Sequence, residues 1–164
     1  MTGASPTPLD DLRVVEISDR IAGAYCGKLL VDAGADVVKV EPPAGDPLRR
    51  FTATGAVPPA GSDAPLFSYL NAGKRSVSAG SAELLACADI VITTQREFDP
   101  LPLLDQSPQC VVVTVSDFGS TGPWSDRAAT EFTLQAASGL TGFRGDPAGP
   151  PISIGGELGE YMGG

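Results

Sequence analysis

The chain has 164 residues, with 20 acidic against 11 basic side chains and a formal net charge of −9. This length fits one domain with a real core, and the negative charge disfavours nucleic acid or an anionic membrane as the main partner. Because the chain contains no histidine, it cannot by itself form a Ser-His or Cys-His nucleophile pair or a histidine-based metal site. We therefore expect no metal. No apolar run approaches the ~20 residues that span a bilayer, and no export signal is recognisable, so we expect a cytoplasmic protein.

Short apolar runs alternate with segments of helical spacing. Strands are predicted at 12–18, 35–41, 89–94 and 110–119, and helices at 22–34, 81–88 (capped by Ser81), 101–106 and 131–140. Residues 42–65 form a long Pro- and Gly-rich loop, and 66–80 a short helical or extended piece that leads into a strand. Because buried strands joined by helices pair in parallel with right-handed crossovers, the pattern predicts an open α/β fold with a mainly parallel sheet.

The turn from the first strand to the first helix, SDRIAGAYCG, raises the question of a ligand site. It carries Gly23 and Gly27 but lacks the G-x-G-x-x-G spacing of a dinucleotide-binding turn. Backbone N–H groups at a helix N-terminus can nevertheless bind an anion, which makes Ile21 and Ala22 candidate binding positions. Equally, the glycines could serve only the packing of the helix against the strand.

Several blocks of the sequence, taken together, resemble the family III CoA-transferases, which include formyl-CoA transferase, carnitine CoA-transferase and the α-methylacyl-CoA racemases. The blocks are GADVVKVEPPAGDPLR, LNAGKRSV, ADIVIT, SDFGSTGPWSDRAATEFTLQAASGL and GDPAGPPISIGGELGEYMGG. The resemblance implies that residues 10–164 are the N-terminal part of a Rossmann-like, CoA-binding domain, preceded by a flexible lead over residues 1–9. It also implies that this chain lacks a second domain, and that it forms a homo-oligomer (an interlinked dimer) or pairs with a complementary chain.

The resemblance also implies a nucleophile. Family members use an aspartate that follows a Pro pair, and counting from Pro150 and Pro151 places Glu160 at that position. This carboxylate would attack the thioester of an acyl-CoA, and CoA thiolate or an acceptor acid would resolve the resulting anhydride. The extra methylene of Glu matters because a misplacement of ~1 Å can cost ~100-fold in rate. Two alternatives stay open: Glu160 only favours a helix N-terminus, or the chain is a non-catalytic CoA-binding or scaffold subunit.

Further site residues follow from the same resemblance. The racemase branch pairs a histidine with an acidic residue that matches Glu131, but Thr130 stands where the histidine would be, so racemisation is disfavoured. Lys74 and Arg75 match a family segment and predict contacts with CoA phosphates, with a solvated charge pair as the alternative. Arg96 would supply charge in the loop that lies along CoA. CoA and acyl-CoA are thus expected as substrates, and no covalently bound cofactor is expected.

Overall fold

The computed structural model describes residues 7–78 and 82–164. Its centre is a sheet of five strands in the order β3-β2-β1-β4-β5, with all neighbours parallel. The strands are β1 (Arg13–Ile17), β2 (Asp36–Val40), β3 (Arg75–Val77), β4 (Ile90–Thr93) and β5 (Val111–Thr114). This is the strand order of a Rossmann fold, so the predicted open α/β class is confirmed.

Helices connect and cover the strands. Helix α1 (Ile21–Asp32) follows β1, and α2 (Pro65–Asn71), α3 (Ala82–Ala86) and α4 (Leu101–Gln106) each precede a strand. The loop predicted over 42–65 contains a 3-10 helix, η1 (Pro47–Arg50), because Pro47 opens it and the Asp46 side chain accepts a hydrogen bond from the Leu48 N–H at 2.7 Å. The predicted cap Ser81 lies outside the described residues.

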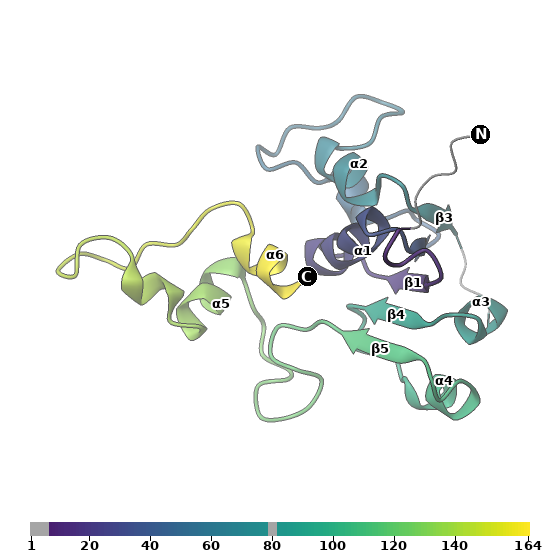
Figure 1. The fold of residues 1–164 in the computed structure, drawn as a ribbon. Helices are drawn as coiled ribbons and strands as arrows, with labels where there is room; N and C mark the ends of the chain where they lie inside the picture. Colours follow the sequence, from purple (N-terminus) through teal and green to yellow (C-terminus); the bar gives the residue numbers. More distant parts are fainter. Residues whose placement is uncertain (1–6, 79–81) are drawn as a thin grey trace.

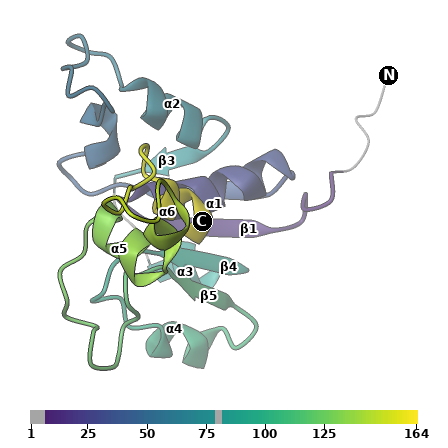
Figure 2. The same ribbon diagram turned by 90° about the vertical axis from the view of Figure 1, so that its left-hand side faces the viewer.

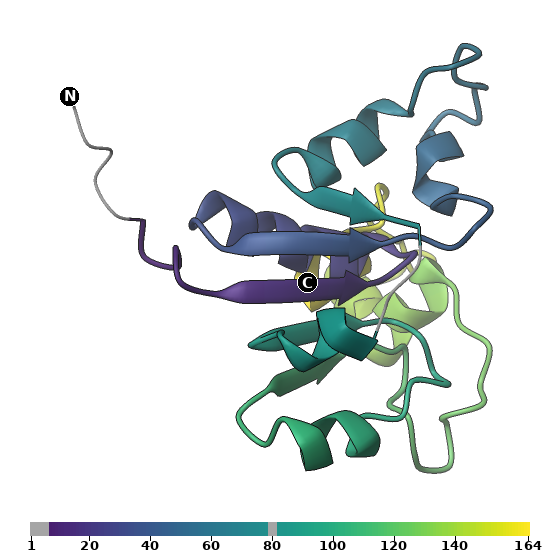
Figure 3. The ribbon, with the colours of Figure 1, turned by 90° about the vertical axis from the view of Figure 1, so that its right-hand side faces the viewer.

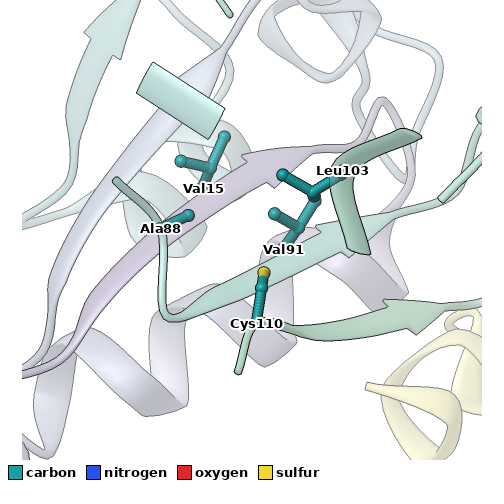
Figure 4. Packing of buried hydrophobic residues seen from close by; sticks show 5 residues of the cluster. All are labelled: Val15, Ala88, Val91, Leu103 and Cys110. Carbon is teal, nitrogen blue, oxygen red and sulfur yellow. The ribbon is translucent and has the colours of Figure 1, made fainter. Parts of the chain in front are cut away.

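The three central strands β1, β2 and β4 are buried on both faces, as their mainly apolar runs require, whereas the outer strands β3 and β5 are largely exposed. Val15 and Val91 face α3 and α4, together with Ala88, Leu103 and Cys110 (Figure 4). The alternate residues Val14 and Ile92 face the opposite way, toward α1. The core therefore holds the central strands β1 and β4 rigidly at the middle of the fold.

The last third of the chain lies at the carboxyl edge of the sheet. In Figure 1 the arrowheads of β4 and β5 point toward α6, and Figure 2 shows α5 and α6 in front of this edge. These elements are α5 (Glu131–Ala137), the 3-10 helix η2 (Leu140–Phe143) and α6 (Leu158–Gly163). The predicted strand 110–119 ends at Thr114, and the chain then leaves the sheet toward α5.

The other end of the described chain lies against the sheet's amino side. Figure 3 shows the N-terminal segment leading into β1 from that side. The N–H of Leu9 donates to the Ala33 carbonyl at 3.2 Å, and the Leu9 side chain packs on the core beside α1. The first six residues of the predicted flexible lead lie outside the described ranges. No helix in these ranges is long and apolar enough to cross a membrane.

Candidate active site

Glu160 lies in the first turn of α6, and its carboxylate points to the N-terminus of a different helix. One oxygen, Oε2, accepts the backbone N–H of Ala22 at 2.9 Å. The other, Oε1, accepts Nε of Arg20 at 2.8 Å and also its Nη2. The side chain is only 12% exposed. The N-terminus of α1 thus binds a carboxylate of the protein itself, and Glu160 caps α1 rather than its own helix.

Arg20 joins a second carboxylate to this pair. Its Nη2 also lies 2.7 Å from Oδ1 of Asp117, a residue of the segment that leaves β5. The hydrogen bond to Asp117 is the main reason that the pKa of Arg20 is raised above its already high value, so the guanidinium stays charged. Because Arg20 follows β1 and Asp117 follows β5, both lie at the carboxyl edge, where open α/β folds bind ligands.

A cavity of about 670 Å³ opens beside this ion-pair cluster. Its volume is that of a small-molecule site. Arg20, Asp117 and Glu160 contribute to its wall, and the other side chains are largely apolar: Val115, Phe118, Trp124, Leu134, Phe143 and Met162. An apolar space that borders a carboxylate can seat an organic chain with its reactive group at Glu160.

Trp124 both packs and lines the cavity. Its ring meets Phe118 edge to face, with centroids 5.5 Å apart, and the guanidinium of Arg127 lies 4.8 Å from the ring centre. These contacts fix the indole in place, because aromatic pairs and cation–π contacts each favour one geometry.

Helix α5 holds the segment that carries Glu160. Oε1 of Glu131 accepts the backbone N–H of Gly159 at 2.7 Å and Nε2 of Gln135 at 2.7 Å. The amide of Gln135 also bonds both the N–H and the carbonyl of Ile154, at 2.7 and 2.8 Å. A Cβ on Gly159 would lie 2.9 Å from Oε2 of Glu131, so only glycine fits there without a shift. Glu131, predicted as catalytic, thus contacts the residue before Glu160.

Helix α1 contacts α6 through an aromatic pair and packs on β1 through its glycines. Tyr25 and Tyr161 meet edge to face at 5.2 Å. A Cβ on Gly23 would lie 2.3 Å from Oγ of Ser18, and one on Gly27 would lie 2.3 Å from Oε2 of Glu16. These glycines therefore serve close packing between α1 and β1, the structural alternative left open by the sequence.

A buried charge cluster lies under the turn between β1 and α1. Nζ of Lys39 lies 2.7 Å from carboxylate oxygens of both Glu16 and Asp46, and it donates to the carbonyl of Ser18 at 2.7 Å. These three charged side chains are at most 1% exposed. Burial by itself would lower the pKa of Lys39, but the charges of Glu16 and Asp46 outweigh it and raise the pKa.

The predicted phosphate-binding cations lie elsewhere. Nζ of Lys74 joins the buried cluster, donating to Glu16 and to the Ala24 carbonyl, each at 2.6 Å, and burial lowers its pKa. Arg75 opens β3, so it lies at the amino edge of the sheet, paired with Asp36. Arg96 follows β4 at the carboxyl edge and pairs with Asp126 at 2.6 Å. Their contacts with CoA stay a prediction.

Sequence reasoning missed Arg20, Asp117 and Gln135. Each could have been suspected from its place, because Arg20 and Asp117 follow strands β1 and β5 and Gln135 lies on the buried face of α5. The contacts that join them to the site are distant in sequence: Arg20 meets Glu160 and Asp117, and Gln135 meets Ile154, which lies 19 residues further along the chain. No local motif marks these contacts.

Comparison with known proteins identifies the family. The family model described as CoA-transferase family III matches residues 9–164. The chain belongs to this family.

Individual members agree over nearly the whole chain. Succinate--glutarate CoA-transferase of Agrobacterium fabrum is 32% identical over 90% of the chain, and succinyl-CoA--D-citramalate CoA-transferase of Chloroflexus aurantiacus is 34% identical over 96% of it. A crystal structure of a CAIB/BAIF family protein from Brucella suis superimposes with a TM-score of 0.84 at 34% identity, over 97% of the chain. The match covers 42% of each of these two transferases and 47% of the Brucella chain, so this chain spans about half the length of these family members.

Proposed function

We propose that the protein transfers CoA from an acyl-CoA to a carboxylic acid, with Glu160 as the nucleophile. The observation that carries this proposal is the place of Glu160: its carboxylate borders an apolar cavity of about 670 Å³ at the carboxyl edge of a Rossmann sheet. The family's activity supports the same reaction class. Because one relative is named for succinate and glutarate, succinyl-CoA and glutarate form a reasonable first pair of substrates.

The chemistry begins with attack of a Glu160 oxygen on the thioester carbon of the acyl-CoA. The C–S bond breaks, CoA leaves as a thiolate, and Glu160 becomes one half of a mixed anhydride. Oε2 stays 2.9 Å from the Ala22 N–H before the attack, at the positive end of α1. This contact fixes the orientation of the carboxylate.

We assign a positioning role to Glu131. It bonds the N–H of Gly159 at 2.7 Å, one residue before the nucleophile. The backbone N–H groups at Ile21 and Ala22 and the side chains of Lys74, Arg75 and Arg96 stay our candidates for CoA contacts. The N–H of Ala22 donates to Glu160 in the resting protein, so it would have to leave that carboxylate to bind CoA. Of the three side chains, Arg96 lies at the same edge of the sheet as Glu160. We further propose that the protein is cytoplasmic and that it works as a homo-oligomer or with a complementary chain. Light scattering coupled to chromatography would test its oligomeric state.

Trapping tests the nucleophile. The purified protein would be treated with succinyl-CoA and then with hydroxylamine or borohydride, and mass spectrometry would locate the modified residue. We expect a single modification on Glu160, absent from Glu160→Gln and unchanged in Glu157→Gln, the neighbouring acidic position. Modification at another residue would refute the assignment.

A non-catalytic CoA-binding subunit is the second candidate. It is favoured by one observation, that both oxygens of Glu160 already accept hydrogen bonds from protein groups. Calorimetric binding of CoA without any trapped adduct would support this candidate, and no binding of CoA would support a scaffold role.

A further inference from the structure

In the resting protein, Arg20 pairs with two carboxylates, those of Glu160 and Asp117. Its Nε lies 2.8 Å from Glu160, and its Nη2 contacts both Glu160 and Asp117. Within the described parts of the chain, the remaining amino group, Nη1, donates no hydrogen bond, and Arg20 is 37% exposed at the cavity wall. The cluster therefore has one positive charge against two negative charges, and the two N–H groups of Nη1 have no hydrogen-bond acceptor among the described residues.

Acylation of Glu160 removes one of these negative charges. An anhydride carbonyl is a much weaker hydrogen-bond acceptor than an ionised carboxylate, because charge-assisted bonds are roughly twice as strong as neutral ones. Arg20 would then keep Asp117 as its one ionic partner and present Nε and part of Nη2 toward the cavity. Asp117 would hold the guanidinium in place during this change.

We propose that Arg20 binds the carboxylate of the acceptor acid once Glu160 carries the acyl group. The same guanidinium thus pairs first with the nucleophile and then with the substrate. This inference rests on the proposed function. The incoming carboxylate replaces the charge that Glu160 has lost, which restores one cation against two anions. It also replaces Glu160 in position, because an acceptor oxygen that attacks the Glu160 carbonyl carbon must come close to the site of Oε1.

The step balances. An acceptor oxygen forms a bond to Cδ of Glu160, and the donor acid leaves as a carboxylate with the electron pair of the broken C–O bond. CoA thiolate then attacks the acceptor's carbonyl carbon, forming the new thioester and returning Glu160 as a carboxylate. Arg20 gains and loses ionic partners in this sequence but transfers no proton.

The variant Glu160→Gln tests, without turnover, whether Arg20 exchanges Glu160 for a substrate carboxylate, because the uncharged amide of Gln imitates the acylated state. Trp124 is the only tryptophan of the chain and lines the cavity, so its fluorescence reports binding of a small acid. The probes are glutarate and butyrate, titrated into the purified protein. We expect Glu160→Gln to bind them roughly 10-fold to 100-fold more tightly than the original protein, the factor of one charge-assisted bond.

Replacing Arg20 tests the same site from the other side. Adding Arg20→Met to Glu160→Gln should abolish the gain, whereas adding Arg20→Lys should leave only part of it, because an ammonium lacks the planar fork of the guanidinium. Glu157→Gln should bind like the original protein, and circular dichroism would confirm that each variant is folded. If the Met variant does not fold, the Lys variant decides.

Two results would overturn the proposal: equal binding by the original protein and Glu160→Gln, or undiminished binding after either change at Arg20. Failure of the proposed function is a different result, because trapping reports whether Glu160 is acylated and the titration reports only whether Arg20 binds a carboxylate.

Discussion

Removal of the Lys39 ammonium should cost far more stability than removal of an exposed cation from the same sheet. Lys39 and its partners Glu16 and Asp46 are at most 1% exposed. In Lys39→Met, Glu16 keeps its bond to Lys74, but Asp46 becomes a buried carboxylate without its ion pair and the Ser18 carbonyl loses a donor. Loss of one partner from a buried pair costs about 3–5 kcal/mol.

The matched control is Arg75→Met. Its ion pair with Asp36 joins side chains that are 65% and 48% exposed, and such surface pairs contribute about 0–1 kcal/mol. Urea unfolding followed by circular dichroism would give the free energy of unfolding of both variants. Equal losses in the two variants would refute the reasoning that burial makes the Lys39 cluster costly to break.

A double variant separates charge from packing. Asp46→Asn removes the unpaired charge but keeps an oxygen that can accept the Leu48 N–H, the bond that caps η1 at 2.7 Å. Lys39→Met with Asp46→Asn should therefore recover about 1 kcal/mol or more relative to Lys39→Met alone. No recovery would show that the loss comes from packing around Lys39.

Two further predictions concern the site and the pH dependence of stability. Gly159→Ala should lower turnover, because its Cβ would lie 2.9 Å from Oε2 of Glu131 and push away the carboxylate that accepts the Gly159 N–H; a resulting shift of ~1 Å at Glu160 would cost ~100-fold. Gly155→Ala, where no described atom would lie within 4 Å of the new Cβ, should retain activity. Hydrogen bonds from Arg49 are the main cause that lowers the pKa of Glu41 from 4.5 to about 2. The ionised form therefore stabilises the fold by about 2 kcal/mol above pH 4.5, and this contribution is lost as the pH falls toward 2. Urea unfolding should show Glu41→Gln to be less stable at neutral pH and equal to the original protein near pH 2, and a constant difference would contradict the assignment.

Local pattern was enough to predict the class of fold. The apolar runs at 12–18 and 35–41 and the intervening helix became β1, β2 and α1, with boundaries that differ by one or two residues. This succeeds because burial on both faces of a parallel strand requires a nearly continuous apolar run, which is visible in the sequence. The strand predicted at 110–119 was too long, since the pattern does not show where a chain leaves the sheet.

The site depended on long-range contacts. The sequence singled out Glu160 through its family register and the start of α1 through the strand-to-helix turn, but it did not show that these two features meet. Lys74 and Arg75, adjacent in the chain, were read together as a phosphate-binding pair, yet one lies in the buried cluster and the other on the surface at the amino edge. Adjacent residues of a strand-leading segment point in different directions, so sequence proximity does not imply a shared ligand.

By itself, the sequence determined most of the strands and helices of the sheet region, the parallel sheet, the family and the carboxylate to examine. Only the tertiary structure decided the partners of that carboxylate, because Arg20 and Ala22 are separated from Glu160 by 140 and 138 positions and meet it only when α6 packs on α1. Hydrophobic periodicity records which face of an element is buried, but it carries no information on which charged groups the packing brings together. For that reason the ion-pair cluster of Arg20, Asp117 and Glu160 became visible only in the folded chain.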